Sequence, residues 1–529
     1  MPEPSPTLDE DRLAGDLDGL RLLGLLDELA SDELGGRFTL HEDIRRAAET
    51  IVARYREAGV EPGTPEGYLL DFEVRVGVEP GATLALTIDG RGVEAGSLVP
   101  LAEGSAGEVE GPLLWVGYGV VKEGEDAAFD ELAGLPLAGA VAVVLDGAPP
   151  NASAEEGRAR PRFDLGDRRL GTKLERLERA GAAAVIVVEA RGLSRGEASR
   201  APAEASPDRP VRHAVAIPVV RLDAAEARAR LPELLRLRQR IDETARPQSR
   251  ALGIRARLHA EVTPRIVRAP NILAMVPGGP LADEIVLVGA HYDHIGTDAP
   301  GHGHCRATTP AAGEVDRVCN GADDNASGSA IVAELAMSMR EAPEPPRRTV
   351  VFAHFAGEEL GLLGSRDLAA RLSTQAPFAG RRVVAMLNVD MVGRLRERLT
   401  VSGVGSSSAW MELLDAIGPR DLRVLYDRSL TSRSDHAPFY EQGIPALFFF
   451  TELHDDYHAP GDESPAIVRE GVLSVAELVA AITHELAAGH PVPFTAPRRP
   501  EDGLVRALPG ELPSAVIKEV GPAAEVAAP

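Results

Sequence analysis

The stretch IVLVGAHYDH, residues 285–294, joins a continuous apolar run to histidine and aspartate residues at its end. Three later runs share this character: TVVFAHF (349–355), VVAMLNV (383–389) and ALFFF (446–450). Apolar runs without polar alternation indicate strands buried on both faces, as in parallel sheets. Helical stretches such as GSAIVAELAMSM (328–339) separate the runs. The sequence therefore predicts an α/β fold with a mostly parallel, mixed central sheet flanked by helices.

Acidic residues and histidines follow the ends of these runs and occupy one turn between them. In a parallel sheet the carboxyl ends of the strands meet at one edge, where ligand sites form, so we expect the side chains to converge there. One candidate comes from the turn NGADDNASG, residues 320–328, which directly precedes a helix. The candidates are His291, Asp323, Glu358, Glu359, Asp390 and His458.

The types of these residues indicate a metal-dependent hydrolase, and above all a peptidase. Two imidazoles and three carboxylates supply ligands for two divalent cations, and a carboxylate that bridges the cations holds them about 3.5–4 Å apart. Glu358 is then left over to act as a general base. Three neighbouring residues are expected to be bystanders, namely His294, Asp298 and His354.

The composition argues against several other functions. The formal net charge of −25 disfavours nucleic acids and anionic membranes as partners. No apolar run reaches the roughly 18 residues that span a bilayer, so no membrane-spanning segment is predicted. Residues 1–17 lack the basic and apolar regions of a signal peptide. This fits a cytoplasmic protein, or a secreted or periplasmic one whose signal has been removed.

The length of 529 residues predicts two or three structural units. Residues 1–96 combine helical and strand patterns and are assigned to the catalytic domain, which resumes over residues 236–490. Residues 97–235 carry short β-rich runs without ligand or nucleophile spacing, so we predict an inserted β-rich domain with no chemistry of its own. Residues 491–529 are rich in Pro, Ala and Glu and are expected to be loosely ordered.

The two cysteines, Cys305 and Cys319, lie in one loop rich in Gly, His and Thr. A disulfide between them would close a short loop and would fit an oxidising compartment. Two free thiols are the alternative. A further alternative is an accessory metal site made by His302, His304 and Cys305.

Six segments of the second half resemble motifs of the M28 metallopeptidases. They are HYDH at 291–294, NGADDNASG at 320–328, AGEELGLLGS at 356–365, NVDMVGR at 388–394, SDHAPFYEQGIPA at 434–446 and YHAPGDE at 457–463. The inserted region resembles a protease-associated (PA) domain. The resemblance therefore covers most of the chain and implies a zinc-exopeptidase fold with an inserted PA domain.

The resemblance implies two zinc ions, and it assigns each candidate ligand to one of the ions or to both. By the order of the motifs, His291 and Asp390 would bind one zinc, and Glu359 and His458 would bind the other. Asp323 would bridge the two ions. These assignments use the same side chains that the strand ends single out.

Further roles follow from the same resemblance. A cis peptide bond from Asp323 to Asp324 would aim the bridging carboxylate. Asp293 would hydrogen-bond to His291 and fix its tautomer. Glu358 would take a proton from the attacking water and then protonate the leaving amine.

The sequence departs from the family at one position. Some members have a tyrosine three residues before the SDH segment, where this chain has Thr431. Stabilisation of the tetrahedral intermediate would then need a metal or another donor. Tyr457, His436 or a backbone amide are the candidates that lie close to the motifs.

The most favoured function is a di-zinc aminopeptidase acting on peptide substrates, and Co²⁺ or Mn²⁺ fit the same ligands. A carboxypeptidase or dipeptidase on the same scaffold is an alternative, and it needs a cation such as Arg394 or Arg433 to hold the substrate carboxylate. A single-zinc enzyme that cyclises N-terminal glutamine is a second alternative, and a non-catalytic binding or receptor module is a third. The side-chain preference and the oligomeric state do not follow from the sequence.

Overall fold

The structure is a computed structural model and describes the residues in the ranges 17–122, 129–151, 161–195, 209–308, 315–418, 422–495, 504–505 and 516–520. The chain divides into two compact units. The first unit combines Met1–Glu73 with Arg268–Pro529, and the second is Val74–Val267. The second unit is larger than the predicted insertion of residues 97–235, because it takes in most of two long strands that precede and follow that region.

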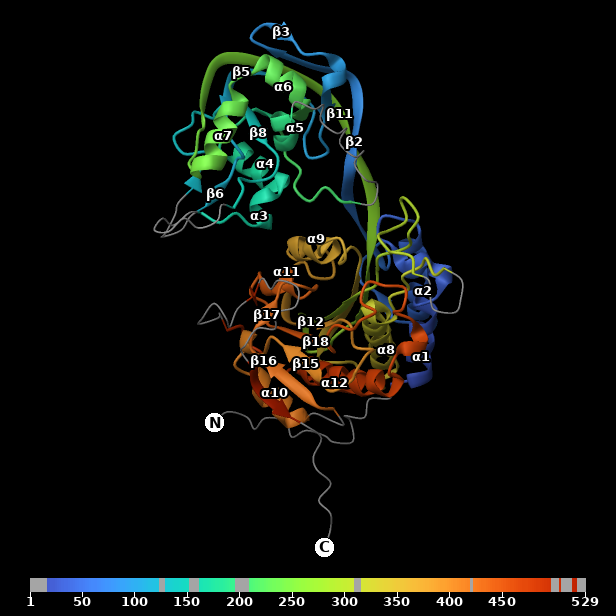
Figure 1. Ribbon diagram of the computed structural model, residues 1–529. Helices are drawn as coiled ribbons and strands as arrows, with labels where there is room; N and C mark the ends of the chain where they lie inside the picture. Colours follow the sequence, from blue (N-terminus) through green and yellow to red (C-terminus); the bar gives the residue numbers. More distant parts are fainter. Residues whose placement is uncertain are drawn as a thin grey trace. The chain divides into compact units, whose positions relative to one another are not determined.

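The first unit contains a mixed sheet in which the central strands are parallel (Figure 1). Its strand order is β20-β16-β15-β18-β14-β12-β13-β11. Strand β12 lies between β13 and β14 and is parallel to both, and β14 is parallel to β18. Antiparallel pairs occur toward the edges, between β11 and β13, β15 and β18, and β16 and β20. This arrangement confirms the predicted α/β fold with a mostly parallel, mixed sheet.

The strands of this unit begin and end as follows: β1 Glu61–Pro62, β2 Leu69–Ile88, β11 Arg250–Val276, β12 Leu281–His291, β13 Arg348–Phe355, β14 Arg382–Val389, β15 Leu399–Ser402, β16 Val424–Asp427, β17 Leu430–Thr431, β18 Ala446–Phe450, β19 Leu504–Val505 and β20 Val516–Val520. Both β2 and β11 continue into the second unit.

Helices cover both faces of the central strands, as the apolar runs predicted. Leu287 of β12 and Val351 of β13 pack in one core cluster with Leu368 and Phe439, which belong to α9 and α11. Helices α8 and α12 also pack against β12 and β13. The helices are α1 Gly19–Leu29, α2 Asp43–Ala58, α8 Gly328–Glu341, α9 Leu363–Arg371, α10 Trp410–Ile417, α11 Ala437–Tyr440 and α12 Arg469–Ala488.

Short helical turns connect these elements: η2 Asp32–Arg37, η4 Ala322–Ser327, η5 Val404–Ser406 and η6 Ser464–Ala466. Helix α12 is the one described helix that is long and apolar enough to cross a membrane by length and composition. Because 67% of its most apolar window is buried inside the protein, core packing accounts for its composition.

The second unit has a parallel core sheet, and it contains several helices beside the β-rich segments that were predicted. Strands β5, β8, β9 and β10 are parallel, while β4 and β11 pair antiparallel at the two edges. The remaining elements are β3 Arg91–Gly92, η3 Ala95–Ser97, β4 Leu98–Pro100, β5 Gly107–Trp115, β6 Val121–Lys122, β7 Phe129–Asp130, β8 Val141–Leu145, α3 Leu165–Arg168, α4 Leu170–Arg179, β9 Ala184–Val188, α5 Ala190–Arg195, β10 Val219–Leu222, α6 Ala224–Arg230 and α7 Leu234–Thr244.

The expected loose tail, residues 491–529, contains two described strands. Strand β19 pairs with β17, and β20 pairs with β16 at the edge of the first unit's sheet. Apart from these strands and residues 491–495, the tail lies outside the described residues.

Candidate metal centre

The register of the parallel strands places their carboxyl ends side by side, at the edge of the sheet where the candidate ligands were expected. His291, the last residue of β12, is opposite Phe355, the last residue of β13. Asp390 directly follows the end of β14, which runs beside β12. The carboxyl ends of the three strands are therefore level, and the loops that leave them carry the candidate ligands to one place.

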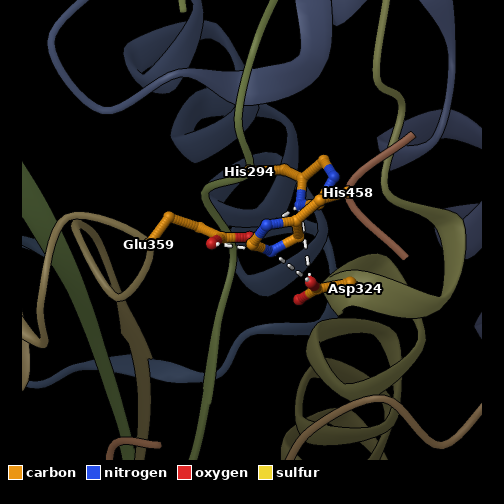
Figure 2. Close-up of side chains that lie close together, drawn as sticks. All are labelled: His294, Asp324, Glu359 and His458. Carbon is orange, nitrogen blue, oxygen red and sulfur yellow. Dashed lines mark ion pairs between the residues drawn. The ribbon is translucent and has the colours of Figure 1, made fainter. Parts of the chain in front are cut away.

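Four side chains form the first cluster, here called the Glu359 group: His294, Asp324, Glu359 and His458. Figure 2 shows them pointing toward one another. Nε2 of His458 lies 3.0 Å from Oε2 of Glu359 and 3.3 Å from Oδ2 of Asp324. Nδ1 of His294 lies 2.9 Å from Oε1 of Glu359 and 3.8 Å from Oδ2 of Asp324.

Three side chains form the second cluster, here called the Asp390 group: His291, Asp324 and Asp390. Nε2 of His291 lies 3.1 Å from Oδ1 of Asp390 and 3.2 Å from Oδ1 of Asp324. Ser434 donates a hydrogen bond of 2.7 Å to the other oxygen of Asp390. Asp324 belongs to both groups and presents one carboxylate oxygen to each.

Asp324, and not the neighbouring Asp323 that was predicted to bridge two metals, is the residue that belongs to both groups. Asp323 lies outside both groups, and its Oδ2 is 3.3 Å from Nε2 of His454. Its Oδ1 accepts a hydrogen bond of 2.5 Å from the backbone N–H of Gly393. The cis peptide bond is also one residue later than expected, between Asp324 and Asn325. Adjacent side chains in an irregular turn point in different directions, and sequence spacing does not reveal which one faces the site.

The three expected bystanders have different surroundings. His294 lies among the candidate ligands, as part of the Glu359 group. His354 is buried and its Nε2 lies 2.6 Å from the hydroxyl of Tyr55, and Asp298 pairs with Arg317 at 2.5 Å. The signal for His294 was its place three residues after His291, in a segment that leaves the strand.

Asp293 is fully buried and contacts the backbone of the expected base and the segment that precedes α2. Its carboxylate accepts a hydrogen bond of 3.2 Å from the backbone N–H of Glu358 and one of 2.6 Å from the hydroxyl of Thr39. Nδ1 of His291 lies 3.1 Å from the backbone carbonyl of Asp293 and 3.7 Å from its carboxylate. The carbonyl, rather than the carboxylate, is therefore within hydrogen-bond distance of that imidazole.

Burial and charge shift the titration of these groups. Burial raises the pKa of Glu358 well above its usual value, and the negative charge of Glu359 adds to the shift, although His291 opposes it. Burial alone would lower the pKa of His458, but Glu359 and Asp324 outweigh it and raise the pKa to about 10. Burial raises the pKa of Asp293 to about 6.

The clustered atoms fit divalent metal ions. Nδ1 of His294, Oε1 of Glu359 and Nε2 of His458 are buried and form no well-aligned hydrogen bond within the described structure. Buried polar atoms normally have partners, because leaving them without one costs about 1–3 kcal/mol. Imidazole nitrogens and carboxylate oxygens directed into one space are zinc ligands, so a cation would satisfy all of them.

The two side chains that were candidates for stabilising the tetrahedral intermediate lie in different surroundings. The ring of Tyr457 stacks on that of His458, with centroids 3.8 Å apart. His436 is buried, its Nε2 lies 2.6 Å from the carbonyl oxygen of Thr431, and its ring stacks on Phe448. Tyr457 is thus next to the Glu359 group, whereas His436 is engaged with backbone and core. Cys305 and Cys319 form a disulfide.

Two residues that support the site had no role in the sequence analysis. Asp462 accepts hydrogen bonds from the backbone N–H groups of Asp323 and Asp324. Arg37 is fully buried and donates to the carbonyl oxygens of Tyr292, Asn320 and Gly321. The one sequence feature that pointed to Asp462 is its place in the segment YHAPGDE. No sequence feature pointed to Arg37, because the residues that it contacts at the site are distant in sequence.

The chain was compared with known proteins. Residues 271–483 match the model of peptidase family M28. A probable leucine aminopeptidase of Arthroderma otae (strain ATCC MYA-4605 / CBS 113480) is 32% identical over 230 residues, which are 42% of this chain and 58% of that protein. Aminopeptidase YwaD of Bacillus subtilis (strain 168) is 31% identical over 33% of this chain and 40% of its own length.

A solved structure, the aminopeptidase from Aneurinibacillus sp. strain AM-1, aligns with 92% of this chain and 98% of its own at 19% identity and a TM-score of 0.47. The chain spans less than two thirds of the length of the two curated relatives. Both relatives are named aminopeptidases. Residues 271–483, which contain both side-chain groups, are thus related to peptidase family M28.

Proposed function

We propose that this protein is a zinc aminopeptidase whose two metal sites share Asp324. The observation that carries the proposal is the position of the Asp324 carboxylate. Its Oδ1 lies 3.2 Å from Nε2 of His291, and its Oδ2 lies 3.3 Å from Nε2 of His458. A carboxylate that offers one oxygen to each of two histidines is placed to bridge two cations.

The two groups define the expected ligands. His291 and Asp390 would hold one zinc ion, Glu359 and His458 the other, and Asp324 both. His294 is a further donor beside Glu359. Bound zinc supplies Lewis-acid chemistry, which polarises a carbonyl oxygen and acidifies water. Co²⁺ or Mn²⁺ fit the same ligand types.

Glu358 is the general base of this proposal. It takes a proton from the attacking water and gives it to the leaving amine, so that the peptide bond breaks without net proton release from the protein. The backbone N–H of Glu358 donates to Asp293, which fixes the start of the loop that carries it. The raised pKa of Glu358 gives the side chain the basicity that proton uptake requires.

The charge around the centre favours the amino end of a peptide. Glu358 is a carboxyl group that the proposal leaves off the zinc ions, so it can accept a hydrogen bond from the α-ammonium group of a peptide, and its negative charge would repel an α-carboxylate. Arg394, a cation considered for holding a substrate carboxylate, is engaged with Asp456 at 3.1 Å and Asp462 at 3.4 Å. Both aminopeptidase relatives are consistent with this orientation.

The choice of substrate end is tested with two blocked peptides. An aminopeptidase cleaves a C-amidated peptide and leaves its N-acetylated form intact, whereas a carboxypeptidase shows the opposite pattern. Cleavage of the N-acetylated peptide alone would reject the proposal. Release of amino acids, followed by mass spectrometry, identifies the end that is attacked.

The bridging role is tested with two neighbouring substitutions. Asp324→Asn removes the shared charge, so we expect the purified protein to lose most of its zinc and its activity. Asp323→Asn, the matched control, should keep the zinc content of the unmodified protein. Elemental analysis of both variants decides, and equal zinc contents would overturn the bridging assignment. Glu358→Gln should keep its zinc and lose activity at least about 10²-fold, the usual scale for a general base.

The second unit is proposed to be the inserted PA-like domain, with bounds near Val74 and Val267. Strands β2 and β11, which lead into and out of it, are paired, and Arg268 donates to Glu73 at 2.9 Å. A two-residue turn can therefore replace residues 74–267. The shortened chain should keep zinc and aminoacyl p-nitroanilide hydrolysis if the unit has no catalytic role, and loss of zinc with intact folding would contradict this.

A further inference from the structure

A third cluster of candidate ligands lies outside the two groups of the metal centre. It consists of His41, Asp43 and His302, each of which places one ligand atom within 4.8 Å of the others. Nδ1 of His41 lies 2.6 Å from Oδ2 of Asp43. The rings of His41 and His302 are 4.0 Å apart, centroid to centroid, at an angle of 35°. Two segments that are far apart in the sequence, but belong to the same unit, therefore bring these donors together.

The donors are held in place by their surroundings. Asp43 begins α2 and is nearly buried, and Arg46 pairs with its Oδ1, which leaves Oδ2 for His41. On the opposite side, the backbone N–H of Thr297 donates to the carbonyl of His302 at 3.0 Å. The N–H of His302 in turn donates to Ala299 at 3.0 Å, which closes a tight turn. Because the backbone at both segments is already fixed, binding an ion requires little ordering of the main chain.

An ion pair between His41 and Asp43 does not explain why His302 lies beside them. His302 brings a second imidazole against the first, with the ring centroids 4.0 Å apart. A cation bound by both rings and the carboxylate accounts for the position of all three side chains. Two imidazoles and one carboxylate, with the remaining position open to water, are a known zinc donor set. The accessory site that the sequence suggested, with His302, His304 and Cys305, is not formed, because the sulfur of Cys305 is in the disulfide.

We propose that His41, Asp43 and His302 bind a Zn²⁺ ion that is separate from the metal centre, with water completing its coordination. The ion would join the segment before α2 to the loop after β12. Thr39, two residues before His41, donates to Asp293 at 2.6 Å. The site therefore tethers the same segment that holds Asp293, without contributing a ligand to the metal centre.

The test counts zinc in the full-length protein at a fixed free zinc concentration. His302→Gln and His41→Gln each remove one donor from a different segment. We expect each variant to bind one zinc equivalent fewer than the unmodified protein after equilibration and gel filtration, as measured by elemental analysis. The matched control is His213→Gln in the second unit, where Nδ1 of His213 lies 2.8 Å from Glu175 as part of a simple surface pair. It should retain every equivalent.

A second background separates this proposal from that of the metal centre. The Asp324→Asn variant should bind one zinc equivalent more than the double variant Asp324→Asn/His302→Gln. Added zinc should raise the thermal unfolding temperature of Asp324→Asn but not that of the double variant. If His302→Gln and His41→Gln bind as much zinc as the unmodified protein in both backgrounds, the site does not exist. If the proposed metal centre did not bind zinc, the total zinc content would be lower, but the difference of one equivalent on adding His302→Gln would remain. Circular dichroism in the presence of a chelator verifies that each variant is folded.

Discussion

Asp462 accepts a hydrogen bond of 3.0 Å from the backbone N–H of Asp324, and the same carboxylate accepts the N–H of Asp323 at 3.1 Å. The two donors belong to η4, the irregular turn that presents the shared carboxylate to both groups. Asp462 is fully buried and lies in the segment that follows His458. One side chain thus connects the turn with Asp324 to the loop that carries His458.

We expect Asp462→Asn to weaken zinc binding about 10- to 100-fold, the usual effect of losing a side chain that orients metal ligands. The amide can accept from only one oxygen and brings N–H donors toward the two backbone N–H groups. Competition with a chromophoric chelator measures the affinity. Asp456→Asn is the control, because Asp456 also contacts Arg394 but its side chain is 43% exposed. Equal affinities for the two variants would show that Asp462 does not hold the turn for metal binding.

A second expectation concerns Thr39, whose hydroxyl donates to the buried carboxylate of Asp293. Thr39→Val removes this donor and leaves the shape almost unchanged. We expect kcat to fall roughly 10-fold, because an unpaired buried acceptor costs about 1–3 kcal/mol and the Asp293 carboxylate accepts the backbone N–H of Glu358. Zinc content should stay the same, and Thr39→Ser should restore activity.

The pH profile of Thr39→Val gives an independent readout. Burial already raises the pKa of Asp293 to about 6, and the hydrogen bond from Thr39 opposes that rise. Loss of the donor favours the protonated carboxyl, so the acidic limb of the kcat/KM profile should move to higher pH. A variant with unchanged activity and an unchanged profile would mean that the hydrogen bond is only structural.

Arg37 is expected to contribute strongly to stability. Its guanidinium donates to the carbonyl of Tyr292 at 2.7 Å, of Asn320 at 2.6 Å and of Gly321 at 3.0 Å, and also to Leu29. Lysine lacks the planar fork that reaches these separate acceptors. We expect Arg37→Lys to reduce the free energy of unfolding of the first unit by about 2–4 kcal/mol, because it leaves buried carbonyls unpaired.

Urea unfolding measures the effect of Arg37→Lys. The control is Arg45→Lys, since Arg45 pairs with Asp71 at the surface and both side chains are about 40% exposed. Exposed ion pairs contribute about 0–1 kcal/mol, so this change should be small. Similar losses for the two variants would contradict the role of the buried guanidinium.

The sequence predicted the sheet and its functional edge because both depend on local patterns. The apolar run before His291 is buried on both faces, and that is a property of the run itself. Local patterns do not predict the direction in which a side chain points from an irregular turn, or a contact between residues far apart in the sequence. Nothing local distinguishes Asp323 from Asp324, because both lie in a turn without a regular side-chain period. Arg37 depends on carbonyls more than 250 residues away, so no window of sequence contains its role.

The second unit should show its own pH dependence, which arises from Glu131. This carboxylate is fully buried and accepts the backbone N–H groups of Tyr118 and Val120, both at 3.0 Å. Burial raises its pKa from 4.5 to about 8. Since the folded form then binds the proton more tightly than the unfolded form, the contribution to stability is full below pH 4.5 and is lost as pH rises to about 8.

Glu131→Gln should therefore flatten the decline in the free energy of unfolding of this unit between pH 5 and 7, where a single group accounts for at most about 1.4 kcal/mol per pH unit. Lys173, whose pKa burial lowers to about 8, acts mainly above that window. The chain has two tryptophans, so Trp410→Phe leaves Trp115 as a fluorescent reporter of the second unit alone. In that background, the exposed Glu110→Gln should keep the slope of the parent protein. If Glu131→Gln also keeps it, the buried carboxyl does not cause the pH dependence.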